Sequence, residues 1–196
     1  MLIDLHCHTL PRSACSALDP LELARLAAER GLGGICLTEH DRAWDTDALE
    51  ALRRAAPVPV FSAAELTTDL GHVLAFGLPA SAFSAEAREL AAAAERHGAL
   101  LYLAHPARDG LLRVTRETVD YFVSVEAANG SDSRLQNIAA AGLAKGFRLP
   151  GIGGSDAHTA AEIGRAATRF AAPVRSDGDL LDALRAGAYE AVLLDA

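Results

Sequence analysis

The chain has 196 residues, of which 51% are hydrophobic, 5% aromatic and 22% charged, which is typical of a globular protein with one core, so we expect one domain over 1–196. The net charge of −8, with no Lys/Arg-rich block to offset it, argues against a duplex nucleic-acid surface. Three cysteines form no disulfide framework, and neither a signal-peptide pattern nor a run of 18 apolar residues is present, so we expect a cytoplasmic protein without membrane contact.

Short apolar runs alternate with Ala/Leu/Glu/Arg-rich segments along the chain. The first run, 2–6, predicts a strand, and 18–31 predicts a helix that Asp19 caps and Gly31 ends. Further strands are expected, in chain order, at 33–38, 58–65, 72–77, 99–105, 122–127 and 150–156, with 166–170 as a candidate strand and 189–194 as the last apolar stretch. Further helices are expected at 45–56, 84–98, 115–122, 132–146, 159–164 and 177–187.

This alternation predicts right-handed βαβ units and a mainly parallel sheet. About seven such strands favour a barrel. Because a regular eightfold barrel runs to about 250 residues, we expect an α/β fold with a small, distorted (β/α)7 TIM-like barrel. An open doubly wound sheet is the structural alternative.

Residues that can bind metal ions gather at the ends of the predicted strands. The carboxyl ends of parallel barrel strands converge on one mouth, where active sites form. His72 begins its apolar run, so it reaches the same mouth if that run is antiparallel to its neighbour. The residues that follow or end their strands are His6, His8, His40, Glu65, His105, Asp156 and His158.

The segment DLHCHT places two histidines one pleat apart. Side chains on a strand alternate with period two, so Asp4, His6 and His8 are expected on one face, with Leu5 and Cys7 on the other. Two imidazoles in this arrangement can grip one metal ion, and Asp4 can hold a ligand ring by its free N–H. A pair of hydrogen-bonded core histidines is the simpler alternative.

Six ordered motifs resemble those of the PHP (polymerase and histidinol phosphatase) family. They are DLHCHT, TEHD, the Glu of SAAEL, GHVLAFG, AHP and GGSDAH. The resemblance implies a distorted barrel that holds two or three divalent ions (zinc, manganese or iron). It also implies hydrolysis of a phosphate ester by a metal-activated water at that site.

The resemblance also implies which residues bind each ion. One ion would be held by His6, His8 and Asp156, and Glu65 would bridge it to a second ion held by His72 and His105. A third would be served by His40 and His158, which are otherwise expected to act as catalytic acid or base.

The chain departs from the family shortly after the His-x-His pair. Where the family supplies another ligand for the third ion, this chain has PRSACS, so that Ser13 or Ala14 stands at the aligned position. Cys15 is the one residue of this segment that can replace the missing ligand, because thiolates bind zinc well.

Two arginines follow the expected ligands. Arg12 and Arg108 are expected to bind phosphate bidentately, with a solvated surface arginine as the alternative for each. Asp41, directly after His40, is expected to support the ligands in the same way as Asp4.

The sequence therefore predicts a phosphoesterase whose substrate is a small phosphate ester or a nucleotide; the oligomeric state is left open. One alternative is a non-catalytic metal-binding PHP module. The other is an amidohydrolase-type metal hydrolase. It is disfavoured because that type adds a metal-bridging lysine at a strand end, whereas Lys145, the only lysine here, lies in a predicted helix.

Overall fold

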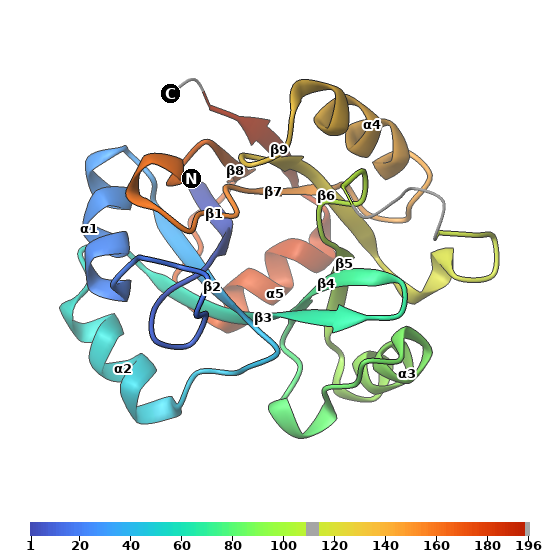
Figure 1. Ribbon diagram of the computed structural model, residues 1–196, viewed down its shortest axis with the longest axis horizontal. Helices are drawn as coiled ribbons and strands as arrows, with labels where there is room; N and C mark the ends of the chain where they lie inside the picture. The colour runs from blue at the N-terminus through green and yellow to red at the C-terminus, as the bar shows by residue number, and fades with distance from the viewer. Residues whose placement is uncertain (109–113, 195–196) are drawn as a thin grey trace.

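The computed structural model describes residues 1–108 and 114–194, whose strands form one curved sheet that nearly closes into a barrel (Figure 1). Across this sheet the strand order is β7-β6-β5-β4-β3-β2-β1-β8-β9. The strands are β1 (Leu2–Cys7), β2 (Gly34–His40), β3 (Val60–Thr68), β4 (Gly71–Phe76), β5 (Leu100–Leu103), β6 (Ser124–Asn129), β7 (Ile152–Gly154), β8 (Ala166–Phe170) and β9 (Tyr189–Leu193).

The sheet is partly parallel and partly antiparallel. Strands β1, β2 and β3 pair in parallel, as do β5, β6 and β7. Strand β4 is antiparallel to both of its neighbours, and β8 and β9 are antiparallel to each other. The prediction of a small, distorted barrel is confirmed, and the antiparallel β4 brings the start of the 72–77 run to the mouth.

The barrel closes where the chain beyond β7 meets the end of β1. The Asp156 N–H donates to the carbonyl of His6 at 2.8 Å, and the His8 N–H donates to the carbonyl of Ala157 at 3.1 Å. A Cβ on Gly154 would lie 2.4 Å from the Cβ of His6, so only glycine allows this close approach. The closure thereby places the two histidines beside the segment that carries Asp156.

Five helices of the described chain accompany the sheet: α1 (Pro20–Glu29), α2 (Thr46–Ala55), α3 (Ala87–His97), α4 (Arg134–Ala144) and α5 (Asp177–Ala186). Their ends follow the sequence signals. The Asp19 carboxylate accepts from the N–H groups of Leu21 and Glu22 at 2.9 and 3.0 Å, and Gly98 ends α3 with φ of 64°. Figure 1 shows α1 to α4 around the outside of the barrel.

Two predicted helices are only short 3-10 turns. The expected helix at 115–122 is reduced to η3 (Val119–Tyr121), and the one at 159–164 to η4 (Ala160–Glu162). The first segment is rich in β-branched and aromatic residues, which are weak helix formers. The second ends at Gly164, whose φ is 71°. A third turn, η1 (Ala80–Ala82), follows β4.

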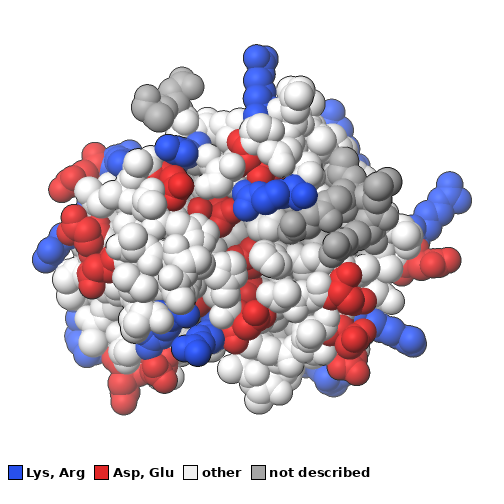
Figure 2. Space-filling view, viewed as in Figure 1, with Lys and Arg blue, Asp and Glu red and all other residues white. Residues whose placement is uncertain are grey.

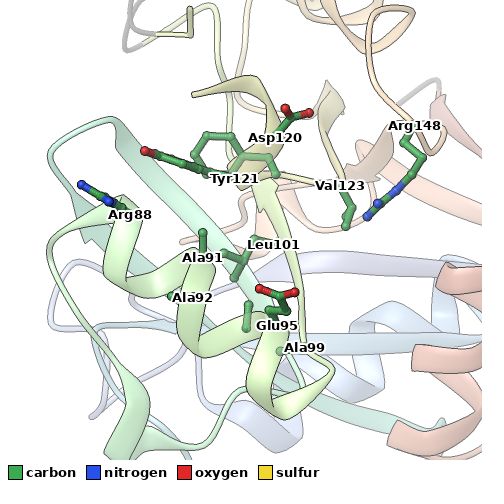
Figure 3. A pocket seen from close by; sticks show the side chains of 12 residues that line it. Arg88, Ala91, Ala92, Glu95, Ala99, Leu101, Asp120, Tyr121, Val123 and Arg148 are labelled. Carbon is green, nitrogen blue, oxygen red and sulfur yellow. The ribbon is translucent and has the colours of Figure 1, made fainter. Parts of the chain in front are cut away.

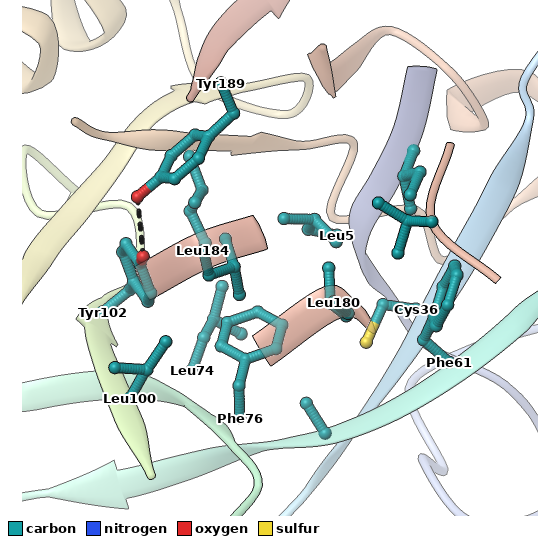
Figure 4. Close-up of a cluster of buried hydrophobic side chains, with 14 of the residues drawn as sticks. Leu5, Cys36, Phe61, Leu74, Phe76, Leu100, Tyr102, Leu180, Leu184 and Tyr189 are labelled. Atoms are coloured by element: carbon teal, nitrogen blue, oxygen red, sulfur yellow. Dashed lines mark hydrogen bonds between the residues drawn. The ribbon is translucent and has the colours of Figure 1, made fainter. Parts of the chain in front are cut away.

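Helix α5 lies across one end of the barrel, behind the strands in Figure 1. Its Leu180 and Leu184 pack among barrel residues such as Leu5 and Phe76 (Figure 4). Burial of each such side chain contributes about 1.5–3 kcal/mol. One end of the barrel is thereby filled with apolar side chains, and the end that carries the carboxyl ends of the parallel strands is left for polar groups.

A second apolar cluster lies between the sheet and the helices α1 and α2. Cys7 belongs to it, together with Leu23 of α1 and Leu52 of α2. Cys7 therefore points to the outside of the barrel, whereas Leu5 packs inside it. The expectation that Leu5 and Cys7 share a face is wrong, because the pairing of β1 with β2 is irregular between Asp4 and Cys7. Among the described helices, none has the length and apolar character needed to cross a membrane.

Candidate metal centre

Glu65, near the middle of β3, lies at the centre of a cluster of histidines. The side chain is buried, and each of its oxygens faces imidazole nitrogens. Oε1 lies 2.9 Å from His72 Nδ1 and 3.0 Å from His105 Nε2, and Oε2 lies 3.1 Å from His8 Nε2, 3.1 Å from His40 Nδ1 and 3.3 Å from His6 Nε2. Five histidines thus converge on one carboxylate, three from strands β1, β2 and β4 and two from the segments that follow β1 and β5.

Asp156 faces the same cluster from the opposite side. Its Oδ1 lies 3.4 Å from His8 Nε2 and 3.5 Å from His6 Nε2, and the two Nε2 atoms are only 3.0 Å apart. Glu65 Oε2 is buried and makes no hydrogen bond within the described residues, although three imidazole nitrogens surround it. Converging nitrogen and carboxylate lone pairs of this kind fit divalent metal ions.

Three groups of side chains place their ligand atoms within 4.8 Å of one another: His6, His8 and Asp156; His40, Glu65 and His72; and His8, His40 and His158. The first matches the set that the family resemblance implies for one ion. In the second, His40 joins Glu65 and His72, with His105 in contact with the same carboxylate. In the third, His8 accompanies His40 and His158, so this position has three imidazoles.

The charges within the cluster support one another. Burial alone would raise the pKa of Glu65, but the charge of His6 and a hydrogen bond from His105 hold it well below its ordinary value. Burial would likewise lower the pKa of His6, but Glu126, Asp156 and Glu65 raise it well above the usual range. The low pKa keeps Glu65 ionised and ready to bind metal, and a bound cation would take the place of imidazole protons.

Glu126 of β6 contacts the outer nitrogen of His6. Its Oε1 lies 2.9 Å from His6 Nδ1, and its Oε2 accepts from the His105 N–H and from the Asn129 side-chain amide, each at 2.9 Å. A buried carboxylate on the outer nitrogen is the usual support of a metal-binding imidazole.

Asp4 does not contact an imidazole, in contrast to its expected role. Its carboxylate accepts instead from the backbone N–H groups of Ser155 at 2.7 Å and His6 at 3.3 Å. The reason is an irregularity in the pairing of β1 with β2 between Asp4 and Cys7, which breaks the simple alternation. Asp4 supports the backbone on both sides of the barrel closure.

Asp41 also lies away from the imidazole rings. It accepts from the N–H and the hydroxyl of Thr67, at 2.8 and 2.9 Å. Its φ is 52°, and His105 and Asp156 also have positive φ values, of 27° and 55°. Such backbone strain in non-glycine residues concentrates at functional sites, and no sequence pattern indicated it.

Arg108 uses its guanidinium within the protein. Nη1 donates to Asp156 at 2.8 Å, Nε donates to Asp132 at 2.7 Å, and Nη2 donates to Asn129 at 3.1 Å. These contacts orient the outer oxygen of Asp156. A direct contact between Arg108 and a substrate stays a prediction, since these bonds would have to be rearranged.

Arg12 lies in the loop after β1, at the rim of the mouth. Its guanidinium carbon lies 3.8 Å from the centroid of the Trp44 ring, and its Nη2 is 2.6 Å from Asp45 Oδ2. Arg12 and Trp44 line an open cavity of about 760 Å³, which Phe83 completes. The expected role of Arg12 in binding substrate stays a prediction.

The segment after the His-x-His pair contains one exposed and one buried candidate. Cys15 is exposed and belongs to none of the three groups. Ser13 is buried, and its Oγ lies 3.4 Å from His8 Nδ1. Glu39, which follows the predicted strand 33–38 within the TEHD motif, is the next-to-last residue of β2 and is also fully buried beside this segment.

The mouth has a mixed electrostatic surface. Figure 2 shows this face, where acidic atoms are visible along a hollow near the middle and basic side chains lie next to it. A separate cavity of about 470 Å³ lies outside the barrel between α3, β5 and η3 (Figure 3). Its lining includes Arg88, Glu95 and Tyr121 but none of the candidate ligands.

Two family models match parts of the chain. The PHP-associated family matches residues 134–189, and a family of unknown function (DUF6282) matches residues 1–76. No curated protein matches the sequence.

Several solved structures share the fold. A two-domain protein from Bacteroides vulgatus ATCC 8482, containing a predicted PHP-like metal-dependent phosphoesterase, has 21% identity and a TM-score of 0.76; the match covers 98% of this chain and 64% of that one. A protein from Bifidobacterium adolescentis ATCC 15703, predicted to be a metal-dependent phosphoesterase, has 16% identity and a TM-score of 0.66, with 94% and 96% covered. An amidohydrolase from Chromobacterium violaceum, with bound sulfate and no metal, has 18% identity and a TM-score of 0.67, with 97% of each chain covered.

The fold and the cluster define a PHP-like barrel with side chains that can hold divalent metal ions. The matches to the PHP-associated family and to PHP-like structures confirm the predicted resemblance to the PHP family. The chain spans about two thirds of the two-domain Bacteroides protein, so the activity of that whole protein does not transfer directly.

Proposed function

We propose that the chain is a metal-dependent phosphoesterase that hydrolyses a small phosphate ester or a nucleotide. The observation that carries this proposal is the position of Glu65, whose two oxygens face different sets of imidazoles. A carboxylate so placed is suited to bridge two cations. Divalent ions bound there would supply Lewis-acid chemistry, by polarising phosphoryl oxygens and lowering the pKa of water.

The side chains of this protein would do the remaining work. Glu126 and Arg108 fix His6 and Asp156 from outside the cluster. His40 and His158 are about one third exposed at the mouth, where their ring nitrogens can exchange a proton with a substrate oxygen. Arg12 at the rim presents a cation beside the aromatic ring of Trp44.

Charge also supports an anionic substrate at this site. The chain carries a net charge of −8, which repels phosphate, and two or three divalent ions would reverse the local sign at the mouth. The Chromobacterium amidohydrolase, which shares the fold, was solved with bound sulfate, a tetrahedral anion. A cytoplasmic location remains part of the proposal.

The amidohydrolase-type alternative has one specific observation against it. Lys145 is the C-cap of α4 and is exposed, so it cannot bridge metal ions at the mouth. The non-catalytic alternative predicts metal binding without turnover. A screen for turnover by the metal-loaded protein distinguishes it from the proposed phosphoesterase.

The test is a screen of the metal-loaded protein against phosphomonoesters, phosphodiesters and amides, with zinc, manganese and iron loaded separately. We expect release of phosphate or of an alcohol from at least one phosphate ester, and Arg12→Ala is expected to raise KM. Turnover of amides alone would favour the amidohydrolase type. Full metal loading without turnover of any ester would favour the non-catalytic module.

A further inference from the structure

Ser13 lies in the segment where the family resemblance implies a ligand for a third ion, at Ser13 or Ala14, and its hydroxyl is fully engaged with its neighbours. Its hydroxyl donates to Glu39 Oε2 at 2.5 Å. Ser13 Oγ also accepts from the His40 N–H at 3.3 Å and lies 3.4 Å from His8 Nδ1. Ser13 thus contacts two candidate metal-binding residues and one buried carboxylate.

Glu39 fixes the direction of this hydroxyl. The other groups around the Glu39 carboxylate are also donors: the N–H of Thr9 at 3.0 Å, the hydroxyl of Thr9, and the indole N–H of Trp44 at 3.1 Å. The carboxylate is fully buried and accepts from all of them. The single hydrogen of Ser13 is therefore committed to Glu39, and only lone pairs of its oxygen remain for other partners.

The lone pairs of Ser13 favour the tautomer of His8 that leaves Nε2 free for a cation beside Glu65 and Asp156. A neutral imidazole carries its hydrogen on one nitrogen only. A bare His8 Nδ1 would oppose the lone pairs of Ser13, whereas an Nδ1–H points a donor at them. The contact of 3.4 Å is long for a hydrogen bond, so its main effect is to disfavour the wrong tautomer.

We infer that Ser13 is a positioning residue that holds His8 as the Nδ1–H tautomer, with Glu39 as its anchor. The Nε2 atom of His8 then presents a lone pair to the cluster, where it lies 3.1 Å from Glu65 and 3.4 Å from Asp156. The segment that lacks the family's ligand thereby contributes a residue that orients a neighbouring ligand.

The arrangement parallels the one at the other histidine of the pair. His6 Nδ1 is held directly by the buried carboxylate of Glu126 at 2.9 Å, and His8 Nδ1 is connected to the buried carboxylate of Glu39 through one hydroxyl. Both imidazoles consequently direct Nε2 to the same point, 3.0 Å from each other. Loss of such an outer partner typically weakens metal binding by roughly 10–100-fold.

The inference rests on the metal site of the proposed function, and its test requires no substrate. Zinc affinity is measured by competition with a chromophoric chelator for the wild type, Ser13→Ala, Ser13→Thr and Ser16→Ala. Ser16 is the matched control, because this buried serine of the same loop donates to the backbone carbonyl of His8 at 2.8 Å and not to its ring.

We expect Ser13→Ala to weaken zinc binding by roughly tenfold or more. Ser13→Thr should restore zinc binding, because it keeps a hydroxyl. Ser16→Ala should stay within about twofold of the wild type, since the contact between Ser13 and the His8 ring is intact. Equal zinc affinity in Ser13→Ala and the wild type would overturn the inference. An equal loss in Ser16→Ala would also overturn it, because the effect would then belong to the loop and not to the ring contact.

A second measurement needs no variant. Nitrogen-15 NMR of the zinc-loaded wild type reports which nitrogen of His8 carries the hydrogen when a cation can occupy the side of Glu65 and Asp156. The Nδ1–H form is expected, and the Nε2–H form would contradict the inference even if Ser13→Ala failed to fold. A wild type that binds zinc but hydrolyses no phosphate ester would refute the proposed function alone, and the role of Ser13 would still be decided by these measurements.

Discussion

Glu126 and His6 form a buried pair in which Oε1 lies 2.9 Å from Nδ1, so the opposite nitrogen of His6 faces Glu65 and Asp156. These residues come from different strands, β6 and β1, which lie far apart in the sheet order. They meet because the barrel closes through β7. The pair therefore links the closure of the fold to the orientation of a candidate metal-binding residue.

Replacement of Glu126 by glutamine should weaken metal binding while the fold persists. Glutamine keeps the size of the side chain but removes its charge. Its NH2 group would face either His6 Nδ1 or the His105 and Asn129 groups that donate to Glu126. We expect a loss of roughly 10–100-fold in zinc affinity, measured by chelator competition. Glu95→Gln, on the exposed face of α3, is the control, and an equal affinity in both variants would contradict the role of Glu126.

Glu65→Ala should remove metal binding at two positions together. Both of its oxygens contact imidazoles, with distances of 2.9 Å to His72 and 3.1 Å to His8. Elemental analysis of the reconstituted variant should show loss of at least two ions, and nearly all turnover should disappear with them. A variant that loses activity but keeps its full metal content would show that Glu65 does not bridge.

The position formed by His8, His40 and His158 should bind metal more weakly than the others. His8 also belongs to the first group and its neutral ring offers one lone pair, so this position keeps only two imidazoles and no carboxylate once the first ion is bound. No ligand charge then offsets that of the cation. Metal titration should resolve two tight sites and a weaker third, and His158→Ala should abolish only the weak one. Three equally tight sites in the wild type would contradict this expectation.

Most of the fold could be predicted from local sequence patterns. The strand at 166–170 has the predicted bounds, and the helices at 45–56 and 177–187 differ from prediction by a residue at one or both ends. The failures were short segments in which weak helix formers or an early glycine limited the structure to a 3-10 turn. The position of α5 across the end of the barrel is set by tertiary packing of Leu180 and Leu184, which no local pattern reveals.

The candidate metal-binding residues could be predicted because they stand at strand ends in ordered motifs. Their supporting residues could not. The break in alternation within β1 moved the expected support of His6 from Asp4 to Glu126, which is distant in sequence. Arg108 resembled a substrate-binding residue in sequence, and only the structure shows its bonds to Asp156 and Asp132.

A buried tyrosine pair at the closed end of the barrel gives a pH-dependent test of the fold. Tyr102 and Tyr189 share a hydrogen bond of 2.7 Å (Figure 4). Burial raises the pKa of Tyr189 from 10.0 to about 12, so above pH 10 the unfolded chain releases a proton that the folded chain retains.

The free energy of unfolding should therefore fall as the pH rises from 10 to about 12. Tyr189→Phe should be less stable at neutral pH, because it leaves the Tyr102 hydroxyl without this partner, but its stability should decline less steeply over the alkaline range. Urea unfolding at several pH values measures both effects. If the free energy of unfolding fell equally steeply with pH in the wild type and in Tyr189→Phe, Tyr189 would not be the residue with the raised pKa.

Metal content per chain tests the central claim most directly. The protein is purified, stripped with a chelator, reconstituted separately with zinc, manganese and iron, freed of excess metal and analysed by mass spectrometry of the elements. Since Glu65 and Asp156 each face imidazoles at distances of 2.9–3.5 Å, we expect at least two ions per chain with one or more of these metals. Fewer than one ion per chain after every reconstitution would contradict the account.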